Sequence, residues 1–209
     1  VKHIHRLILL SHTGQQSSFV EPHSATIDGD NKWLWRFSSR RLEGEAIRDS
    51  MLLVTGELNL KTGGPGFNFF KTRGGLSGFP EVDKFGPEEM RRMIYSHKIR
   101  MERVPVFGAF DCPDAGQATP VRTQSTTAIQ ALNLFNSPFV ADRAEKLAAR
   151  IEPDHPDDTQ SQVRRAFRLT LGRTPSAIEL SKSTAVVNKH GLATLCRVLF
   201  NCNEFLFIP

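Results

Sequence analysis

Paired acidic residues are the first candidates for chemistry in this sequence. Asp111 and Asp114 flank a Cys-Pro dipeptide, while Glu45 and Asp49 lie four residues apart in a segment, 40–58, that has helical periodicity. Two carboxyl groups in one cleft can carry out acid–base work, as in glycoside hydrolysis, or bind a hard cation. Aspartates such as Asp111 and Asp114 are also common in turns, where they accept hydrogen bonds from the backbone. These four residues are the candidate catalytic residues, with a turn-forming role as the alternative for the two aspartates.

Arginine, tryptophan and glutamine side chains supply the candidate binding residues. These are Arg41, Arg48, Arg122, Gln130, Trp33 and Trp35. The segment 32–41 interleaves tryptophan with basic residues, a composition that stacks on bases or sugar rings but also anchors a following helix by packing. The segment 40–49 sets arginine and acid at helical spacing, which predicts either a salt-bridged solvent face or a buried arginine network that braces a long loop. Gln130 also completes a capping box with Thr127, so it either binds a ligand or caps a helix.

Cofactor and metal motifs are not evident in this segment. The sequence contains no phosphate-binding loop, dinucleotide fingerprint, zinc-protease helix or serine-hydrolase elbow. Asp28, Asp30 and Asn31 resemble half of a calcium loop, but the acidic residue expected at its twelfth position is missing. His3 and His5 would project from opposite sides of a helix, and the three cysteines form no Cys-x-x-Cys pair. We expect no cofactor and no metal in this segment.

The composition indicates a globular protein with an ordinary core. The chain has 209 residues, of which 39% are hydrophobic and 23% charged. No apolar run approaches the ~18 residues of a membrane span. The net charge is +5, with basic residues spread along the chain rather than clustered, so we expect a mildly basic solvated surface and no nucleic-acid partner. The chain starts at Val1 without a leader pattern, and we interpret it as a piece of a longer polypeptide.

Hydrophobic periodicity predicts a mainly α protein. Helical patterns are expected over 1–11, 40–58, 127–135, 139–151, 158–171, 175–191 and 192–206, and alternation predicts a half-buried strand over 92–101. Seven of the 15 glycines lie in the segment 59–89, together with five phenylalanines. Disordered linkers contain few aromatic residues, so this loop should pack onto another part of the fold. Within it, residues 63–66 could form an anion-binding nest, although a plain turn is favoured.

These patterns together give an irregular helical domain. We expect a helical region over 1–152 with a long Gly/Phe-rich insertion over about 59–91, and a C-terminal helical subdomain over 153–209. The last 70 residues are expected to form a small helical bundle with short connections. One or two short strands complete the fold. The whole chain is expected to be one family domain cut from a larger protein.

Several segments, taken in order, resemble a known family. They are residues 1–8 with 15–18, 30–36, 40–49, 63–65, 110–114, 125–136, 171–175 and 199–205. The family is the domain of unknown function that ends many large planctomycete proteins. Relatives often carry a cysteine shortly after the Pro-Asp pair, whereas residues 118–120 here read Ala-Thr-Pro. A redox or metal role for such a cysteine is therefore not carried over.

The resemblance implies a setting and partners for the chain. It implies an exported multidomain protein, located in the periplasm or at the cell surface, in which an upstream domain of the same polypeptide is the partner. A cytochrome-c-like haem domain often lies further upstream in such proteins, so any haem would belong to another domain. The resemblance also implies a connection with polysaccharide.

Three functional hypotheses follow. The first is an accessory or binding domain of an exported, possibly cytochrome-linked protein, without catalysis in this segment alone. The second is a glycan-active enzyme domain that uses Asp111, Asp114 and the helix from Arg41 to Asp49. The third is a module that binds anionic polymers through Arg36, Arg40, Arg41, Arg91, Arg92 and Arg100.

Overall fold

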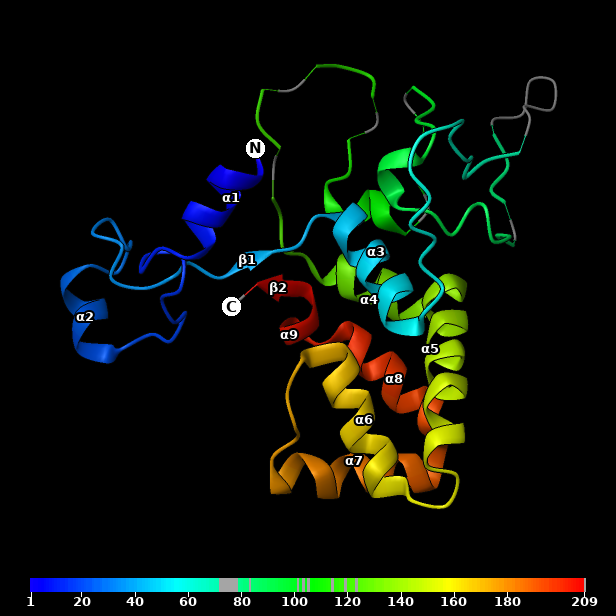
Figure 1. Ribbon diagram of the computed structural model, residues 1–209. Helices are drawn as coiled ribbons and strands as arrows, with labels where there is room; N and C mark the ends of the chain where they lie inside the picture. Colours follow the sequence, from blue (N-terminus) through cyan, green and yellow to red (C-terminus); the bar gives the residue numbers. More distant parts are fainter. Residues whose placement is uncertain are drawn as a thin grey trace. The chain divides into compact units, whose positions relative to one another are not determined.

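The computed structural model confirms a mainly helical protein (Figure 1). It describes residues 1–71, 79–82, 84–100, 102, 104, 106–113, 115–118, 120–122 and 124–208. The elements, in chain order, are α1 (Lys2–Leu9), α2 (Pro22–Ile27), β1 (Arg40–Arg41), α3 (Gly44–Thr55), η1 (Met93–Tyr95), η2 (Phe107–Phe110), α4 (Ala128–Asn136), α5 (Pro138–Ile151), η3 (Glu152–Asp154), α6 (Thr159–Leu171), α7 (Ala177–His190), α8 (Leu192–Asn201), α9 (Asn203–Leu206) and β2 (Phe207–Ile208). No helix of the described residues is long and apolar enough to cross a bilayer.

The chain divides into two compact units. The smaller contains residues 1–41 and 207–209, and the larger contains residues 42–206. In the smaller unit, β1 pairs antiparallel with β2, so that Arg41 lies opposite Phe207. The larger unit holds α3 to α9 and the long loop. The domain boundary expected near residue 152 stays a prediction.

Local signals set the ends of the helices in the larger unit. Thr127 and Gln130 form the expected capping box at the start of α4. The Ser137 hydroxyl accepts from the Val140 amide to cap α5, whose first residue is a proline. Gly56 ends α3 with a φ of +82°, a left-handed conformation that glycine adopts at little cost.

The helices α5, α6, α7 and α8 pack into the expected C-terminal bundle. The closest packing joins α5 to α8. Its core side chains, each less than one-tenth exposed, include Val140, Leu147, Ile151, Val163, Phe167, Leu195, Leu199 and Phe200. Burial of each such side chain is worth about 1.5–3 kcal/mol relative to exposure. This bundle supports the face of α5 that contacts the long loop.

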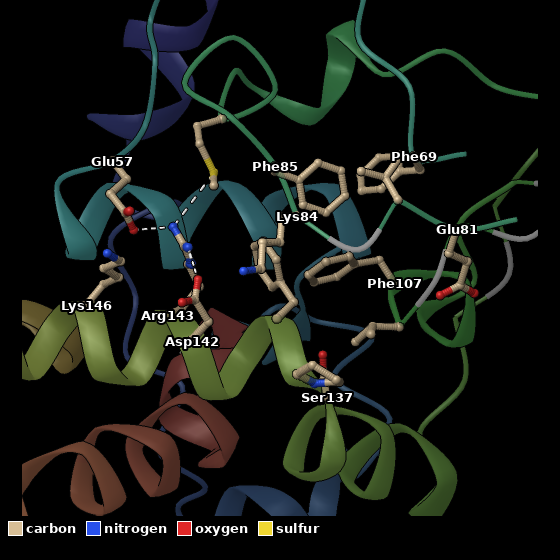
Figure 2. Close-up of a pocket in the computed structure, with 15 residues that line it drawn as sticks. Glu57, Phe69, Glu81, Lys84, Phe85, Phe107, Ser137, Asp142, Arg143 and Lys146 are labelled. Atoms are coloured by element: carbon tan, nitrogen blue, oxygen red, sulfur yellow. Dashed lines mark hydrogen bonds and ion pairs between the residues drawn. The ribbon is translucent and has the colours of Figure 1, made fainter. Parts of the chain in front are cut away.

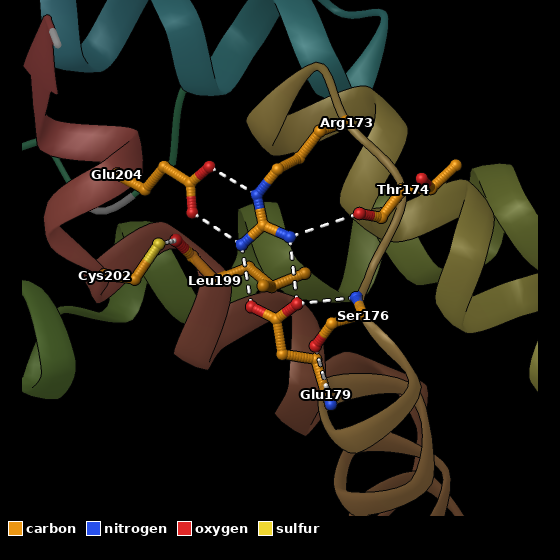
Figure 3. Close-up of polar contacts among 7 residues, drawn as sticks. All are labelled: Arg173, Thr174, Ser176, Glu179, Leu199, Cys202 and Glu204. Carbon is orange, nitrogen blue, oxygen red and sulfur yellow. Dashed lines mark hydrogen bonds and ion pairs between the residues drawn. The ribbon is translucent and has the colours of Figure 1, made fainter. Parts of the chain in front are cut away.

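An arginine cluster joins the α6–α7 turn to α9 (Figure 3). Arg173 donates to both carboxylate oxygens of Glu179, at 2.9 and 2.7 Å, and to both of Glu204, at 2.6 and 2.8 Å. Glu179 also caps α7 together with Ser176. The guanidinium therefore connects the α6–α7 turn, the first turn of α7 and α9.

The strand predicted over 92–101 is wrong. Residues 93–95 instead form the 3-10 turn η1, because the amides of Tyr95 and Ser96 bond back to the carbonyls of Arg92 and Met93. The carboxylate of Asp49 accepts a hydrogen bond from the Met93 amide at 2.7 Å. The backbone of the loop pairs with this region through isolated bridges, Asn59 with Arg91 and Phe67 with Ser96.

Candidate functional site

Arg48 is a buried brace for the long loop. Its side chain is 0% exposed, and its two terminal nitrogens donate to the carbonyls of Arg91, at 2.8 Å, and of Glu89, at 2.7 Å. Its guanidinium lies 5.0 Å from the ring centre of Phe67 and 5.4 Å from that of Phe69. Burial lowers the pKa of Arg48 to about 10, which still leaves it cationic at neutral pH. This is the buried arginine network, the second of the two alternatives for residues 40–49.

Arg91 continues this network into the glycine turn. It donates to the carbonyls of Lys61, Gly63 and Pro65, with the shortest distance 2.7 Å to Gly63. The Gly63 amide donates to the Tyr95 hydroxyl at 3.1 Å. Three carbonyls of this turn therefore point at a cation, so the segment is a turn held by arginine and does not form an anion-binding nest.

Glu45, in the first turn of α3, forms an ion pair with Arg122. Arg122 donates to both carboxylate oxygens of Glu45, at 3.0 and 3.1 Å, and to Glu43 at 2.8 Å. Burial raises the pKa of Glu45, but hydrogen bonds from its own backbone and from Arg122 outweigh this, so the pKa lies below its usual value. The thiol of Cys112 lies 3.5 Å from the same carboxylate.

Asp111 and Gln130 form a second, separate cluster. The carboxylate of Asp111 accepts from the Ser125 amide at 2.7 Å and from its hydroxyl at 2.9 Å. The Gln130 amide donates to the carbonyls of Ala109 and Ser125, at 2.9 and 3.1 Å. Both side chains thus tie the segment around η2 to the start of α4. Asp114 lies outside the described residues.

The remaining candidates belong to the smaller unit. Trp33 is 75% exposed, whereas Trp35 is half-buried and donates its indole N–H to the carbonyl of Asp28. The Asp28 carboxylate accepts from the amides of Lys32 and Trp33, so it shapes a loop rather than a calcium site. Arg41 is buried in β1.

Within the described residues, the carboxylates of Glu45, Asp49 and Asp111 each have their own partners. No group of three or more acidic, cysteine or histidine side chains in this part of the chain could hold a metal.

A cavity of about 740 Å³ in the larger unit was not anticipated from the sequence (Figure 2). Its lining residues come from four places: the residue after the C-cap of α3, the long loop, the region of η2 and the start of α5. They are Glu57, Phe69, Glu81, Val82, Lys84, Phe85, Met90, Val106, Phe107, Ser137, Pro138, Phe139, Asp142, Arg143 and Lys146. The expectation that the phenylalanine-rich loop packs onto another part of the fold is confirmed here.

The apolar part of the cavity is a chain of aromatic contacts. The ring of Phe85 lies edge-on to Phe69, with 5.5 Å between ring centres, and to Phe139, at 6.4 Å. Phe107 packs edge-on to Phe139 at 5.6 Å. Such edge-to-face pairs are worth about 0.5–1.5 kcal/mol beyond the area that they bury. The aromatic wall is therefore ordered by its own contacts.

The polar part of the cavity contains an arginine that is paired with two acidic side chains, and two lysines. Arg143, which is buried, forms ion pairs with Glu57 and Asp142 and contacts the Met90 sulfur at 3.7 Å. Lys84 and Lys146 line the same cavity, and neither forms an ion pair with any other described residue. Figure 2 shows Lys84 between the phenylalanine rings and the Arg143 cluster.

One sequence signal could have indicated this wall. Phe139, Asp142, Arg143 and Lys146 have the three- and four-residue spacing of a single helix face. Their loop partners lie more than fifty residues earlier in the chain, at a distance that periodicity does not report. The acidic pairing that neutralises Arg143 could not be read from the sequence either.

Comparison with known families gives a clear result. Residues 1–187 match the model of the PSD1 family, described as a protein of unknown function (DUF1553). The chain belongs to this family. No curated protein and no solved structure matches it.

The cavity of this PSD1-family chain lies within the matched residues. Every residue that lines it, from Glu57 to Lys146, falls in the range 1–187. Chemically, the cavity offers an aromatic wall, two lysine ammonium groups and the Glu81 carboxylate. This arrangement can hold an organic molecule with an apolar face and an acidic group.

Proposed function

We propose that this PSD1-family chain is an accessory binding domain whose cavity takes a small acidic organic ligand with an apolar ring face. The observation that carries the proposal is the distribution of charge around the cavity. Glu57 and Asp142 neutralise Arg143, while Lys84 and Lys146 have no acidic partner among the described residues. The lining is balanced overall, with three acidic and three basic side chains, but two ammonium groups beside the aromatic wall are left outside the ion pairs and are available to an acidic ligand.

The size and lining of the cavity support this kind of ligand. Ligand sites usually measure about 300–1,000 Å³ and combine apolar walls with a few polar groups, and this cavity has about 740 Å³. The carboxylate of the ligand would bind the ammonium groups of Lys84 and Lys146. Its ring would pack on the phenylalanines, and a hydroxyl of the ligand would donate to Glu81. An acidic sugar has all three features.

The family resemblance adds a setting to the proposal. An acidic sugar agrees with the implied connection to polysaccharide, and with an exported domain that serves an upstream domain of the same polypeptide. Binding without catalysis is favoured, because the carboxylates of Glu45, Asp49 and Asp111 are engaged by other groups of the fold. A polymer-binding arginine surface is less well supported, since Arg91 is buried and holds three carbonyls.

Calorimetric titration of the full chain tests the proposal. Short oligogalacturonates are compared with their methyl esters, which keep the rings and remove the charge. We expect binding of the acids, weaker binding of the esters and a loss of affinity as salt is raised. Equal affinity for acids and esters, or no binding of either, would contradict the proposal.

A further inference from the structure

A second cluster in the larger unit lies outside the cavity. The Nζ atom of Lys98 lies 2.8 Å from the Sγ atom of Cys112. This separation is ordinary for a nitrogen donor and an oxygen acceptor, but it is short for the larger sulfur atom. The amine and the thiol are therefore close enough for a single atom to join them.

The surroundings of Cys112 favour chemistry with this lysine. Cys112 is only 8% exposed, which shields it from other thiols. The remaining cysteines, Cys196 and Cys202, lie on or directly after α8, and all three are free. Lys98 is thus the amine side chain that contacts the sulfur among the described residues.

A carboxylate next to the sulfur accepts a hydrogen bond from it. Cys112 donates to Glu45 at 3.5 Å, and Arg122 holds that carboxylate in place with two hydrogen bonds. Burial raises the pKa of the Cys112 thiol, although the hydrogen bond from Lys98 opposes this. The hydrogen bond to Glu45 therefore orients the thiol while its sulfur stays in contact with Lys98.

We propose that Lys98 and Cys112 form a site of oxidative modification, in which dioxygen joins them through a single oxygen atom, as Nζ–O–Sγ. In the balanced step, one thiol, one unprotonated amine and one dioxygen give the bridge and one water. The O–O bond, the S–H bond and one N–H bond break, and an S–O and an N–O bond form. Dioxygen takes up four electrons from sulfur and nitrogen, and the two hydrogens leave in the water.

The bridge would join the segment after η1 to the segment after η2. Lys98 follows η1, which Asp49 fixes through the Met93 amide. Cys112 follows η2, which contributes Phe107 to the cavity wall. A covalent bridge between these segments removes conformations from the unfolded chain, so it should raise the Tm. This inference does not depend on what the cavity binds.

Intact mass spectrometry of the full chain tests the bridge. Protein prepared with reductant and without oxygen is compared with the same protein after exposure to air. We expect a gain of one oxygen and a loss of two hydrogens that survives denaturation, reverses with dithiothreitol and maps to a cross-linked peptide pair containing Lys98 and Cys112. The change should be absent in Cys112→Ser and Lys98→Arg and retained in Cys202→Ser, the matched cysteine control.

Other mass changes would overturn the proposal. An unchanged mass after air exposure excludes the bridge in the wild-type protein, whether or not the variants fold. Loss of two hydrogens without oxygen would indicate a direct S–N bond instead. A mass gain of one or more oxygen atoms on Cys112, without loss of hydrogen and with Lys98 unmodified, would indicate simple thiol oxidation.

Discussion

The side chain of Arg48 binds the backbone carbonyl of Arg91, and the side chain of Arg91 binds three carbonyls of the turn at residues 61–65. One buried guanidinium therefore positions a second, and the second holds the start of the long loop. The same loop supplies Phe69, Lys84 and Phe85 to the cavity. Arg48 and Arg91, which the sequence suggests as binding residues, therefore hold a loop whose other residues line the cavity.

The first prediction concerns the stability that Arg48 provides. Arg48→Met keeps much of the side-chain volume but leaves the carbonyls of Arg91 and Glu89 without their donor. Each buried group that loses its partner costs about 1–3 kcal/mol, so we expect the free energy of unfolding to fall by about 2–5 kcal/mol. Urea denaturation followed by circular dichroism measures this difference.

Arg164→Met is the matched control for that experiment. Arg164 is exposed on α6, and its substitution should change the free energy of unfolding by less than about 0.5 kcal/mol. Equal effects of the two substitutions would show that Arg48 is not the brace described here.

A second prediction separates structure from catalysis at Asp111. Its carboxylate accepts two hydrogen bonds from Ser125, so Asp111→Ala should lower the free energy of unfolding by about 1–3 kcal/mol. The affinity for a cavity ligand should stay within a few-fold of the wild-type value. Asp157→Ala, at an exposed position between η3 and α6, provides the control for stability. A stable Asp111→Ala protein that had lost ligand binding would assign Asp111 to a binding site.

A third prediction concerns pH. Arg173 and the Ser176 amide lower the pKa of Glu179 to about 2, from an ordinary value near 4.5. Because the folded-state pKa is depressed, the contribution of Glu179 to stability is complete above about pH 4.5 and is lost as the pH falls towards 2. The difference in Tm between wild type and Glu179→Gln should therefore shrink over this range. A difference that is constant from pH 6 to pH 3 would refute the pairing.

Much of the helical framework can be predicted from the sequence, because its signals are local. The capping boxes at Thr127 and Ser176, the proline after Ser137 and the apolar stripes of α5 and α8 lie within a few residues of the helices that they define. The segment 92–101 was misread for the same reason. Its alternation is a local pattern, but the Asp49 carboxylate, 44 residues earlier, takes the Met93 amide and favours the turn.

The candidate site depends on contacts that local patterns do not report. The sequence marks Arg48 and Gln130 as candidate binding residues, but it cannot distinguish a ligand from a backbone carbonyl as their partner. The carbonyls that they bind belong to Glu89, Arg91, Ala109 and Ser125. The cavity likewise forms only when the long loop folds against α5. Its two lysines, Lys84 and Lys146, stay outside the ion pairs that Arg143 forms with Glu57 and Asp142.

The most direct test of the proposed function compares the affinity of an acidic ligand for the wild type with its affinity for the double variant Lys84→Gln/Lys146→Gln. Its matched control is Lys182→Gln/Lys189→Gln, which removes two exposed lysines from α7. Charge-assisted hydrogen bonds contribute about 1.5–3 kcal/mol each, so loss of both should weaken the binding of an oligogalacturonate about a hundredfold or more, with an unchanged Tm. The α7 variant should bind as the wild type does. Equal affinities of the two variants would contradict the assignment of the cavity as an acidic-ligand site.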